Sequence, residues 1–206
     1  MPSETDYSSD AGNFNVISGA PTSIQDYNSN SANIEVGHVT GSPDNKYYGL
    51  CQFICNQANS ATITTASLTL HAISNDGVAV TLYGVKQGNA TWPSSAGAAN
   101  SLTLTTANVS FTSGIGYNTI NVASILQEIV NQGGYASGNY IMFMLKGPTN
   151  NWQAWDSYGG NLVVANRPTL VINGGGGGGS GGSGGQRGPN ATTLLLQLMG
   201  QRFNGF

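Results

Sequence analysis

Few side chains in this 206-residue sequence are able to do acid–base, nucleophilic or metal chemistry. It contains nine carboxylates, two histidines and two cysteines. Six of the carboxylates fall in the N-terminal segment or in turns, where Asp commonly serves as a turn former: Glu4, Asp6, Asp10, Asp26, Asp44 and Asp76. The sequence has no nucleophile-elbow, zinc-protease or phosphate-loop motif and no C-x₂-C pair. We therefore predict no catalytic residues, no metal site and no cofactor.

His71 is the histidine placed best for chemistry, within the strand-like segment 61–72. Its neighbours at alternate positions are polar, so the imidazole is expected on the face opposite the apolar side chains. No carboxylate or serine motif lies nearby in the sequence to make it a general base. We expect a surface or half-buried strand histidine.

Cys51 and Cys55 lie on one face of the predicted strand 46–55, together with Phe53. Four residues of regular strand separate the two Cα atoms by ~13 Å, which exceeds the ~7 Å limit for a disulfide. A C-x₃-C pair is also found in metal sites, but neither histidine lies at a ligand spacing. We predict two reduced, buried cysteines.

Three aromatic residues gather in WQAWDSY, and aromatic rings among Asn and Asp suit the binding of sugar rings. Trp152, Trp155 and Tyr158 are therefore candidate glycan-binding residues. On a strand, however, Trp152 and Trp155 point to opposite faces, so at least one of them is expected in the core.

Apolar and polar residues alternate between turn signals along most of the chain, as in a β domain. Strands are expected at the segments 32–39, 46–55, 61–72, 78–85, 101–106, 109–112, 139–145, 152–156, 162–165 and 169–172, with one edge strand before residue 30. The Asn-Asp-Gly turn at residues 75–77 predicts that the two strands around it pair as a hairpin.

The one helix expected in the body follows residue 122, because large apolar residues recur there at helical spacing. They are Val122, Ile125, Leu126, Ile129 and Val130. Asn121 is positioned to cap the start, and the glycines at 133 and 134 to stop it. Many short strands with one helix predict an all-β antiparallel jelly-roll sandwich.

Charge is scarce, with six Lys and Arg residues scattered along a chain of net charge −3. They are too few and too dispersed to follow a phosphate backbone, so nucleic acid is not an expected partner. The sequence has no apolar run of about 18 residues for a membrane span. Its N-terminus has neither the basic start nor the apolar stretch of a secretory signal.

A glycine–serine run at residues 174–185 divides the chain into a body and a tail, and such runs behave as flexible linkers. We predict four segments: an extended lead-in at 1–26, a jelly-roll domain at 27–173, the linker at 174–185 and an anchoring tail at 186–206. The apolar side chains of the tail are its expected partner-binding residues: Leu194, Leu195, Leu196, Leu198, Met199, Phe203 and Phe206. The alternative is that the tail folds back on its own domain.

Several stretches resemble DNRLRE-type domains, the jelly-roll modules of bacterial surface and tailed-phage structural proteins. They occur in the order YYGLCQF, ATITTASLTLHA, VTLYGV with ATW, INVASILQEIVNQG and NRPTLVIN, between about residues 27 and 173. The strand arginine often found near Tyr48 in that family is absent, as is the motif that names it. The resemblance implies a structural or adhesive module without enzymatic activity.

These features together favour a virion structural protein of a tailed phage, made in the host cytoplasm. It would be an outer head decoration protein or fibre whose tail binds other virion proteins. We expect a homo-oligomer, with a trimer favoured, and a host surface glycan as a further candidate ligand. One alternative is a carbohydrate-binding or adhesive module of a bacterial surface protein. Another is an engineered display protein, since the glycine–serine run also resembles a cloning linker.

Overall fold

The computed structural model describes residues 3–7, 10–17, 20–26, 33–39, 45–74, 77–148, 151–156 and 166–175. Its elements in chain order are β1 (Ser3–Tyr7), β2 (Asp10–Ile17), β3 (Ala20–Asp26), β4 (Asn33–Val39), β5 (Asn45–Cys55), β6 (Thr62–Ala72), β7 (Val78–Val85), α1 (Ala96–Asn100), β8 (Leu104–Ser113), β9 (Gly116–Asn121), α2 (Ala123–Val130), β10 (Asn139–Lys146), β11 (Trp152–Asp156) and β12 (Thr169–Gly175). Neither of these two helices is long and apolar enough to cross a membrane.

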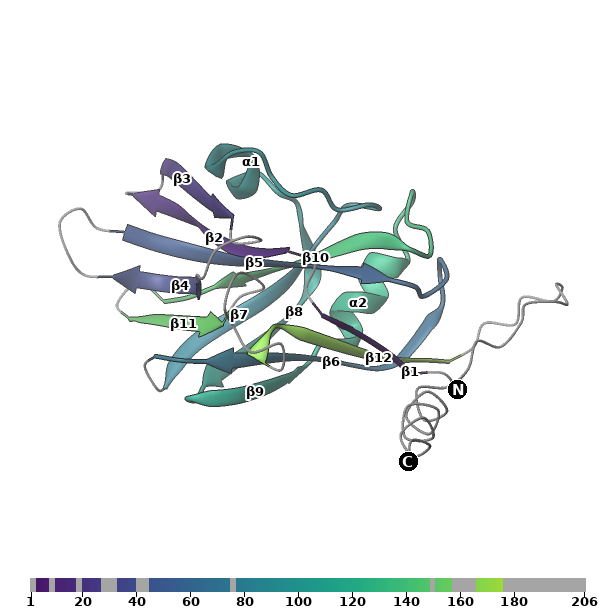
Figure 1. The fold of residues 1–206 in the computed structure, drawn as a ribbon. Helices are drawn as coiled ribbons and strands as arrows, with labels where there is room; N and C mark the ends of the chain where they lie inside the picture. Colours follow the sequence, from purple (N-terminus) through teal and green to yellow (C-terminus); the bar gives the residue numbers. More distant parts are fainter. Residues whose placement is uncertain are drawn as a thin grey trace, which may run out of the picture.

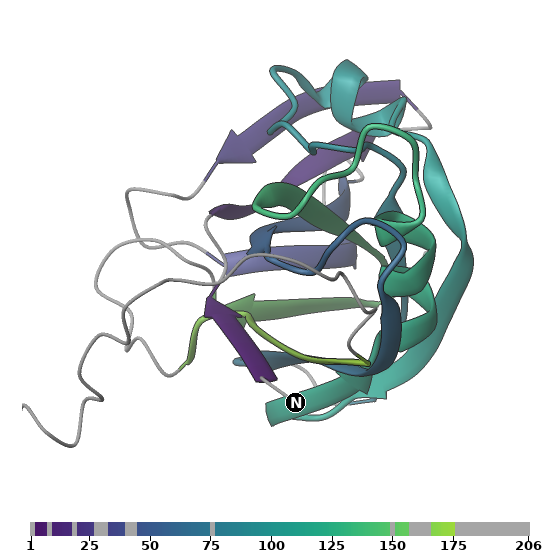
Figure 2. The same ribbon diagram turned by 90° about the vertical axis from the view of Figure 1, so that its right-hand side faces the viewer.

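The described strands form one antiparallel sheet in the order β1-β12-β6-β11-β4-β5-β10-β7-β8. Three more strands lie off this path: β2 pairs with β5, β3 pairs with β2, and β9 pairs with β6. The sheet curls around its own apolar face into an open half-barrel (Figures 1 and 2). The all-β antiparallel fold predicted from the alternating pattern is confirmed.

Strand β10 lies at the centre of the body, between β5 and β7, and is apolar on both faces as its sequence predicts. Ile141, Phe143 and Leu145 enter the main core, inside the curl of the sheet. Met142 and Met144 point to the outer face and belong to a second, smaller core. A strand buried on both sides needs a second layer, and α1 with the segment around it provides one.

The main core includes the side chains of β5 that the alternation predicted. Cys51, Phe53 and Cys55 are fully buried there, and the Phe53 ring meets that of Phe143 edge to face at 5.9 Å. Both cysteines are free, as predicted. Burial raises the pKa of the Cys51 thiol well above its ordinary value, although a backbone hydrogen bond at Phe143 offsets part of this effect.

We predict that neither cysteine reacts with a thiol reagent in the native protein. Reaction requires the thiolate and access to it, and complete burial denies both. If the reagent reaches the thiols only after global unfolding, and the free energy of unfolding is at least about 5 kcal/mol, the labelling rate should be more than about a thousandfold lower than in denatured protein. Labelling followed by mass spectrometry measures this, and Cys51→Ala and Cys55→Ala identify each site. Rapid labelling of either residue under native conditions would contradict the prediction.

The helix α2 packs against both β6 and β8 on the inner face of the curled sheet. Its predicted apolar side chains, Val122, Ile125, Leu126, Ile129 and Val130, are all fully buried. On one side, Gln127 accepts from the backbone N–H of Ile63 at 2.8 Å and donates to the carbonyl of Ala61 at 2.9 Å. On the other side, Glu128 accepts from backbone N–H groups of β8. Polar groups at two strand edges are thereby paired by side chains of one helix.

The N-terminal segment is more ordered than predicted. Instead of one edge strand before residue 30, the structure has three: β1 pairs with β12, β2 with β5, and β3 with β2. The prediction was wrong because the segment contains isolated apolar residues rather than a clear alternation. Its strands extend the sheet beside β12 and β5.

Three further expectations are corrected between residues 62 and 113. Strands β6 and β7 do not pair: β6 pairs with β9, β11 and β12, whereas β7 pairs with β8 and β10. The two short strands expected at 101–106 and 109–112 are one strand, β8. One helix was expected in the body, but the structure has a second, α1, which Ser95 caps by accepting from the N–H of Ala98 at 3.1 Å.

Candidate functional site

The tail residues predicted to bind a partner lie outside the described residues: Leu194, Leu195, Leu196, Leu198, Met199, Phe203 and Phe206. The structure shows where the chain leaves the body toward them. Strand β12 continues to Gly175, so the first two glycines of the predicted linker pair with Ile63 and Thr62. Ser3 pairs with Asn173 beside them. We call this end of the body, defined by Ser3, Thr62 and Gly175, the exit end.

The aromatic residues considered for glycan binding do not share a surface. Trp155 is 0% exposed and packs in the main core. Trp152 is half-buried and points to the other face of β11, as the strand alternation predicted. Tyr158 lies outside the described residues. The ring of Trp155 is therefore not accessible to a ligand in this arrangement.

A polar network surrounds His71 at the other end of β6, which we call the far end. His71 Nδ1 lies 2.8 Å from Asp156 Oδ2, and because an ionised carboxylate only accepts, the imidazole donates. Asn166 donates to the same oxygen at 3.0 Å and accepts from the Tyr117 hydroxyl at 2.9 Å. The rings of His71 and Tyr117 meet edge to face at 4.7 Å. Four side chains from β6, β9, β11 and the residues before β12 thus hold one another in place.

His71 is a half-buried strand histidine, as predicted, but a carboxylate that the local sequence does not reveal lies beside it, because Asp156 comes 85 residues later. No local signal could have joined them, since the sheet brings β6 and β11 together only at Ala72 and Trp155. An aspartate that orients a histidine is also part of hydrolase triads. Among the described residues, however, no Ser, Thr or Cys hydroxyl or thiol is hydrogen-bonded to His71. The described residues therefore show His71 and Asp156 as members of a polar network, with no nucleophile hydrogen-bonded to the imidazole.

Exposed apolar side chains flank this network. Ile115 is 69% exposed, Tyr117 61% and Ile73 42%, although large apolar residues elsewhere in this body are mostly buried. The pairing of His71 with Tyr117 and of Ala72 with Gly116 places all three at the far end of β6 and β9. Exposed apolar side chains beside ordered polar groups are typical of contact surfaces.

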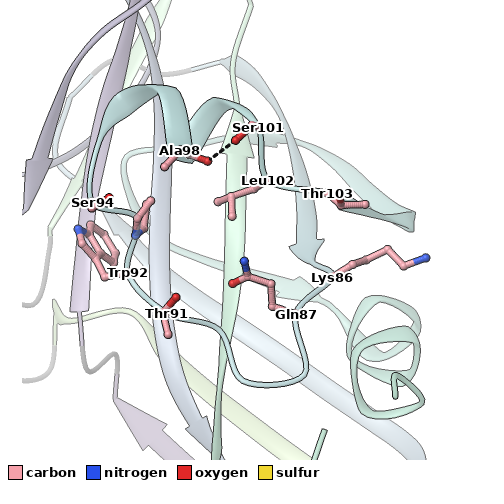
Figure 3. Close-up of a pocket in the computed structure, with 10 residues that line it drawn as sticks. Lys86, Gln87, Thr91, Trp92, Ser94, Ala98, Ser101, Leu102 and Thr103 are labelled. Carbon is pink, nitrogen blue, oxygen red and sulfur yellow. Dashed lines mark hydrogen bonds between the residues drawn. The ribbon is translucent and has the colours of Figure 1, made fainter. Parts of the chain in front are cut away.

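A hollow of about 510 Å³ opens on the outer face of the sheet, between α1 and the segment that leads to it (Figure 3). Trp92 and Leu102 line it and also pack against the second core. Lys86 lies at its border and points away from it (Figure 3). The Lys86 ammonium lies 3.3 Å from a carboxylate oxygen of Glu128.

Glu128, the carboxylate beside Lys86, is held by backbone hydrogen bonds. Its two oxygens accept from the backbone N–H groups of Thr106 at 3.0 Å and Ala107 at 2.9 Å. Partial burial raises the pKa of this carboxyl, but the two backbone hydrogen bonds and Lys86 outweigh it, so the pKa lies below its ordinary value. The charge of Lys86 is accordingly neutralised by a stable anion.

We predict that Glu128→Gln lowers the free energy of unfolding by about 2 kcal/mol at pH 7, because it weakens two hydrogen bonds to a charged group. The folded-state pKa is depressed, so this stability is fully present above the ordinary pKa of 4.5 and is lost as the pH falls through the folded pKa. Urea unfolding from pH 7 to pH 3 should therefore show the two proteins converging in acid.

Glu35→Gln is the matched control, since burial raises the pKa of Glu35. For this carboxyl, ionisation in the folded state is disfavoured, so the stability of the variant relative to the parent protein should rise between pH 4 and pH 7. A Glu128→Gln difference that stays constant from pH 7 to pH 3 would contradict the prediction.

Within the described residues, no three His, Cys, Asp or Glu side chains come together as a metal site requires. No protein-family model matches the chain, and a search of curated proteins finds no significant relative. The resemblance to DNRLRE-type domains accordingly stays a prediction from the sequence motifs.

Proposed function

We propose that this chain is a non-enzymatic structural protein of a tailed-phage virion. In this proposal the β body is displayed on the outside of the particle, as a head decoration protein or fibre. The C-terminal residues 186–206 attach it to other virion proteins through their leucine and phenylalanine side chains. The fold alone does not imply this role, because all-β antiparallel bodies serve many functions.

The observation that best supports the proposal is that the body has two distinct ends, the exit end and the far end. The first and last strands pair, and the chain leaves the body at Gly175, beside Thr62 at the start of β6. The ordered far-end surface with His71 and Tyr117 lies at the other end of the same strand. Ten residue steps along β6 at about 3.3 Å each separate the two ends by roughly 30 Å. A body held at its exit end would therefore present the far end outward (Figure 1).

A single tail is a weak anchor, because the apolar burial that seven side chains offer is opposed by the entropy of ordering the residues around them. Several tails acting together bind far more tightly than one, since each attachment raises the effective concentration of the next. The proposal therefore includes a symmetric homo-oligomer, with a trimer favoured.

The experiment compares the full chain with a chain that ends at Gly175, which keeps every residue pair of β12. Each protein is added to particles from the source phage that lack it, and bound protein is measured by cosedimentation and immunogold labelling. We expect the full chain to label the particle surface and the shortened chain to remain free at an unchanged melting temperature. Analytical ultracentrifugation of both proteins measures the oligomeric state.

Leu195→Asp with Leu198→Asp is the matched variant, because it keeps the length of the tail and removes only its apolar character. It is expected to behave like the shortened chain. If the shortened chain decorates particles normally, the anchoring role is refuted and the body itself makes the contact. If no particle binds the full chain, the virion role is refuted.

A further inference from the structure

We propose that the hollow beside α1 is a binding site for a neutral carbohydrate, centred on Trp92 and Gln87. This inference goes beyond the anchoring role and does not depend on it. The site lies on the outer face of the sheet, whereas α2 packs on the inner face. It is also separate from the aromatic residues of β11.

The hollow is built on a rigid floor. The second core beneath it is formed by fully buried side chains of β5, β7 and β10 with small residues of α1 and the preceding segment: Leu50, Val85, Met142, Met144, Ala90, Ala96 and Ala99. Trp92 and Leu102 lie half-buried against this layer. The indole is therefore fixed by packing on one side while it lines the hollow on the other.

The segment that carries Trp92 is also held at its start. The N–H of Ala90 donates to the carbonyl of Tyr140, and Gln52 Nε2 donates to the carbonyl of Ala90, at 2.8 Å and 2.7 Å. Asn89 Oδ1 accepts from the N–H of Tyr140 at 2.9 Å. Three hydrogen bonds thus fix the chain two residues before the indole, and a preorganised site loses less entropy on binding.

Two residues that line the hollow each carry a buried polar atom with no hydrogen-bond partner among the described residues: Gln87 Oε1 and Trp92 Nε1. A buried polar group left unpaired costs about 1–3 kcal/mol, so two around one hollow need an explanation. In Figure 3 the amide of Gln87 is drawn below Leu102, with Trp92 on the other side of the view. The terminal torsion of a glutamine is soft, so a small rotation turns Oε1 toward a ligand at little cost.

The remaining groups around the hollow indicate the class of ligand. Besides the indole and the amide, it is lined by hydroxyl side chains: Thr91, Ser94, Ser101 and Thr103. Lys86, the cation at its border, is neutralised by Glu128. Uncharged donors and acceptors around an aromatic face fit an uncharged ligand with many hydroxyl groups. The C–H face of a sugar ring packs on the negative face of an indole, and its hydroxyls reach the surrounding side chains.

The size of the hollow agrees with such a ligand. Its volume of about 510 Å³ lies within the usual range of about 300–1,000 Å³ for small-molecule sites. An anionic sugar or a phosphate ester is disfavoured, because the described residues around the hollow offer no cation that is not already paired. A neutral mono- or disaccharide unit is the ligand class that these residues favour.

The test uses the three tryptophan indole N–H signals of the full chain in ¹H–¹⁵N NMR spectra. Trp92→Phe and Trp152→Phe identify their signals, and retention of the other signals shows that each variant is folded. The probes are glucose, galactose, mannose and N-acetylglucosamine with their disaccharides, and N-acetylneuraminic acid and inorganic phosphate as charged comparisons. We expect at least one neutral sugar to shift the Trp92 signal in a saturable way.

Gln87→Leu keeps the size of the side chain and removes the amide, so it should weaken that sugar by about tenfold, as the loss of one ligand hydrogen bond would. Trp152→Phe should leave the affinity unchanged. The proposal is overturned if no neutral sugar shifts the Trp92 signal, if the charged probes bind more tightly, or if Gln87→Leu binds as well as the parent chain. Because this test needs no particle, its outcome is independent of the anchoring role.

Discussion

Replacing Trp155 by alanine is expected to lower the free energy of unfolding by about 3–5 kcal/mol, the usual cost of removing a fully buried large aromatic side chain. Trp155 is 0% exposed, and it packs in the main core with Ile34 and Ala72, its partners across β4 and β6. It is the largest fully buried side chain in the described structure. Urea unfolding followed by circular dichroism measures the loss.

Two control variants separate the causes of that loss. Trp152→Ala lies on the same strand, faces the other way and is half-buried, so a cost of about 1 kcal/mol is expected. Trp155→Phe should cost less than Trp155→Ala, since it keeps most of the ring and removes an indole N–H that has no partner among the described residues. Equal costs for Trp155→Ala and Trp152→Ala would contradict the assignment of Trp155 to the core.

Replacing Gly37 by alanine is the second change with a large expected effect, at about 3 kcal/mol or more. Gly37 has φ +102°, a conformation that side chains rarely adopt and that costs about 1–3 kcal/mol. Its Cβ would also collide with the carbonyl oxygen of Asn151 and lie 3.0 Å from the Cα of Trp152. That carbonyl accepts from the N–H of His38 at 2.8 Å, so it cannot move away without losing a hydrogen bond.

Gly77→Ala is the matched control, because Gly77 also has a positive φ, +75°, but its Cβ would point into open space. It should cost about 1 kcal/mol, from the backbone conformation alone. In a domain of this size 1 kcal/mol corresponds to about 2–4 °C in melting temperature, so thermal unfolding distinguishes the two variants. A Gly37→Ala protein that melts no lower than Gly77→Ala would show that β4 and β11 do not approach as closely as described.

The elements that could be predicted from the sequence are those whose burial follows a regular period. Strand β5 and helix α2 face the core with the side chains expected of them, because alternation and helical spacing record burial directly. Strand partners follow no such rule. The Asn-Asp-Gly signal at 75–77 predicted a hairpin of β6 with β7. That prediction was wrong, because β7 pairs with β8 and β10, strands that come later in the sequence.

Local polar contacts explain the errors in the segment 86–113. Two short strands were expected there because the alternation breaks near Ala107. The break is an irregularity within one strand: Thr105 accepts from the N–H of Gly84 at 2.8 Å and donates to the carbonyl of Ala107 at 2.7 Å, beside a register shift at Tyr83. Helix α1 is one turn of small residues that has too few large side chains to show a period.

The sequence drew attention to His71 and to the aromatic residues as single candidates, but it did not show which side chains lie beside each of them. The network joins residues 46 to 95 positions apart to His71, and the hollow around Trp92 depends on a helix that was not expected. Nothing in the local sequence distinguishes Trp92 from an ordinary half-buried tryptophan. Its unpaired indole N–H becomes visible only when the surrounding side chains are in place.

The pairing of β12 between β1 and β6 also has a mechanical consequence. Force that enters the body at Gly175 pulls along the axis of β12, while the hydrogen bonds to both neighbours are perpendicular to that axis. All of these bonds are then loaded together in shear, instead of being opened one after another as in peeling. A body pulled through Gly175 along β12 should therefore withstand a larger force than one pulled at right angles to β12. The time it stays folded under that force is set by the rate at which β12 separates from its two neighbours.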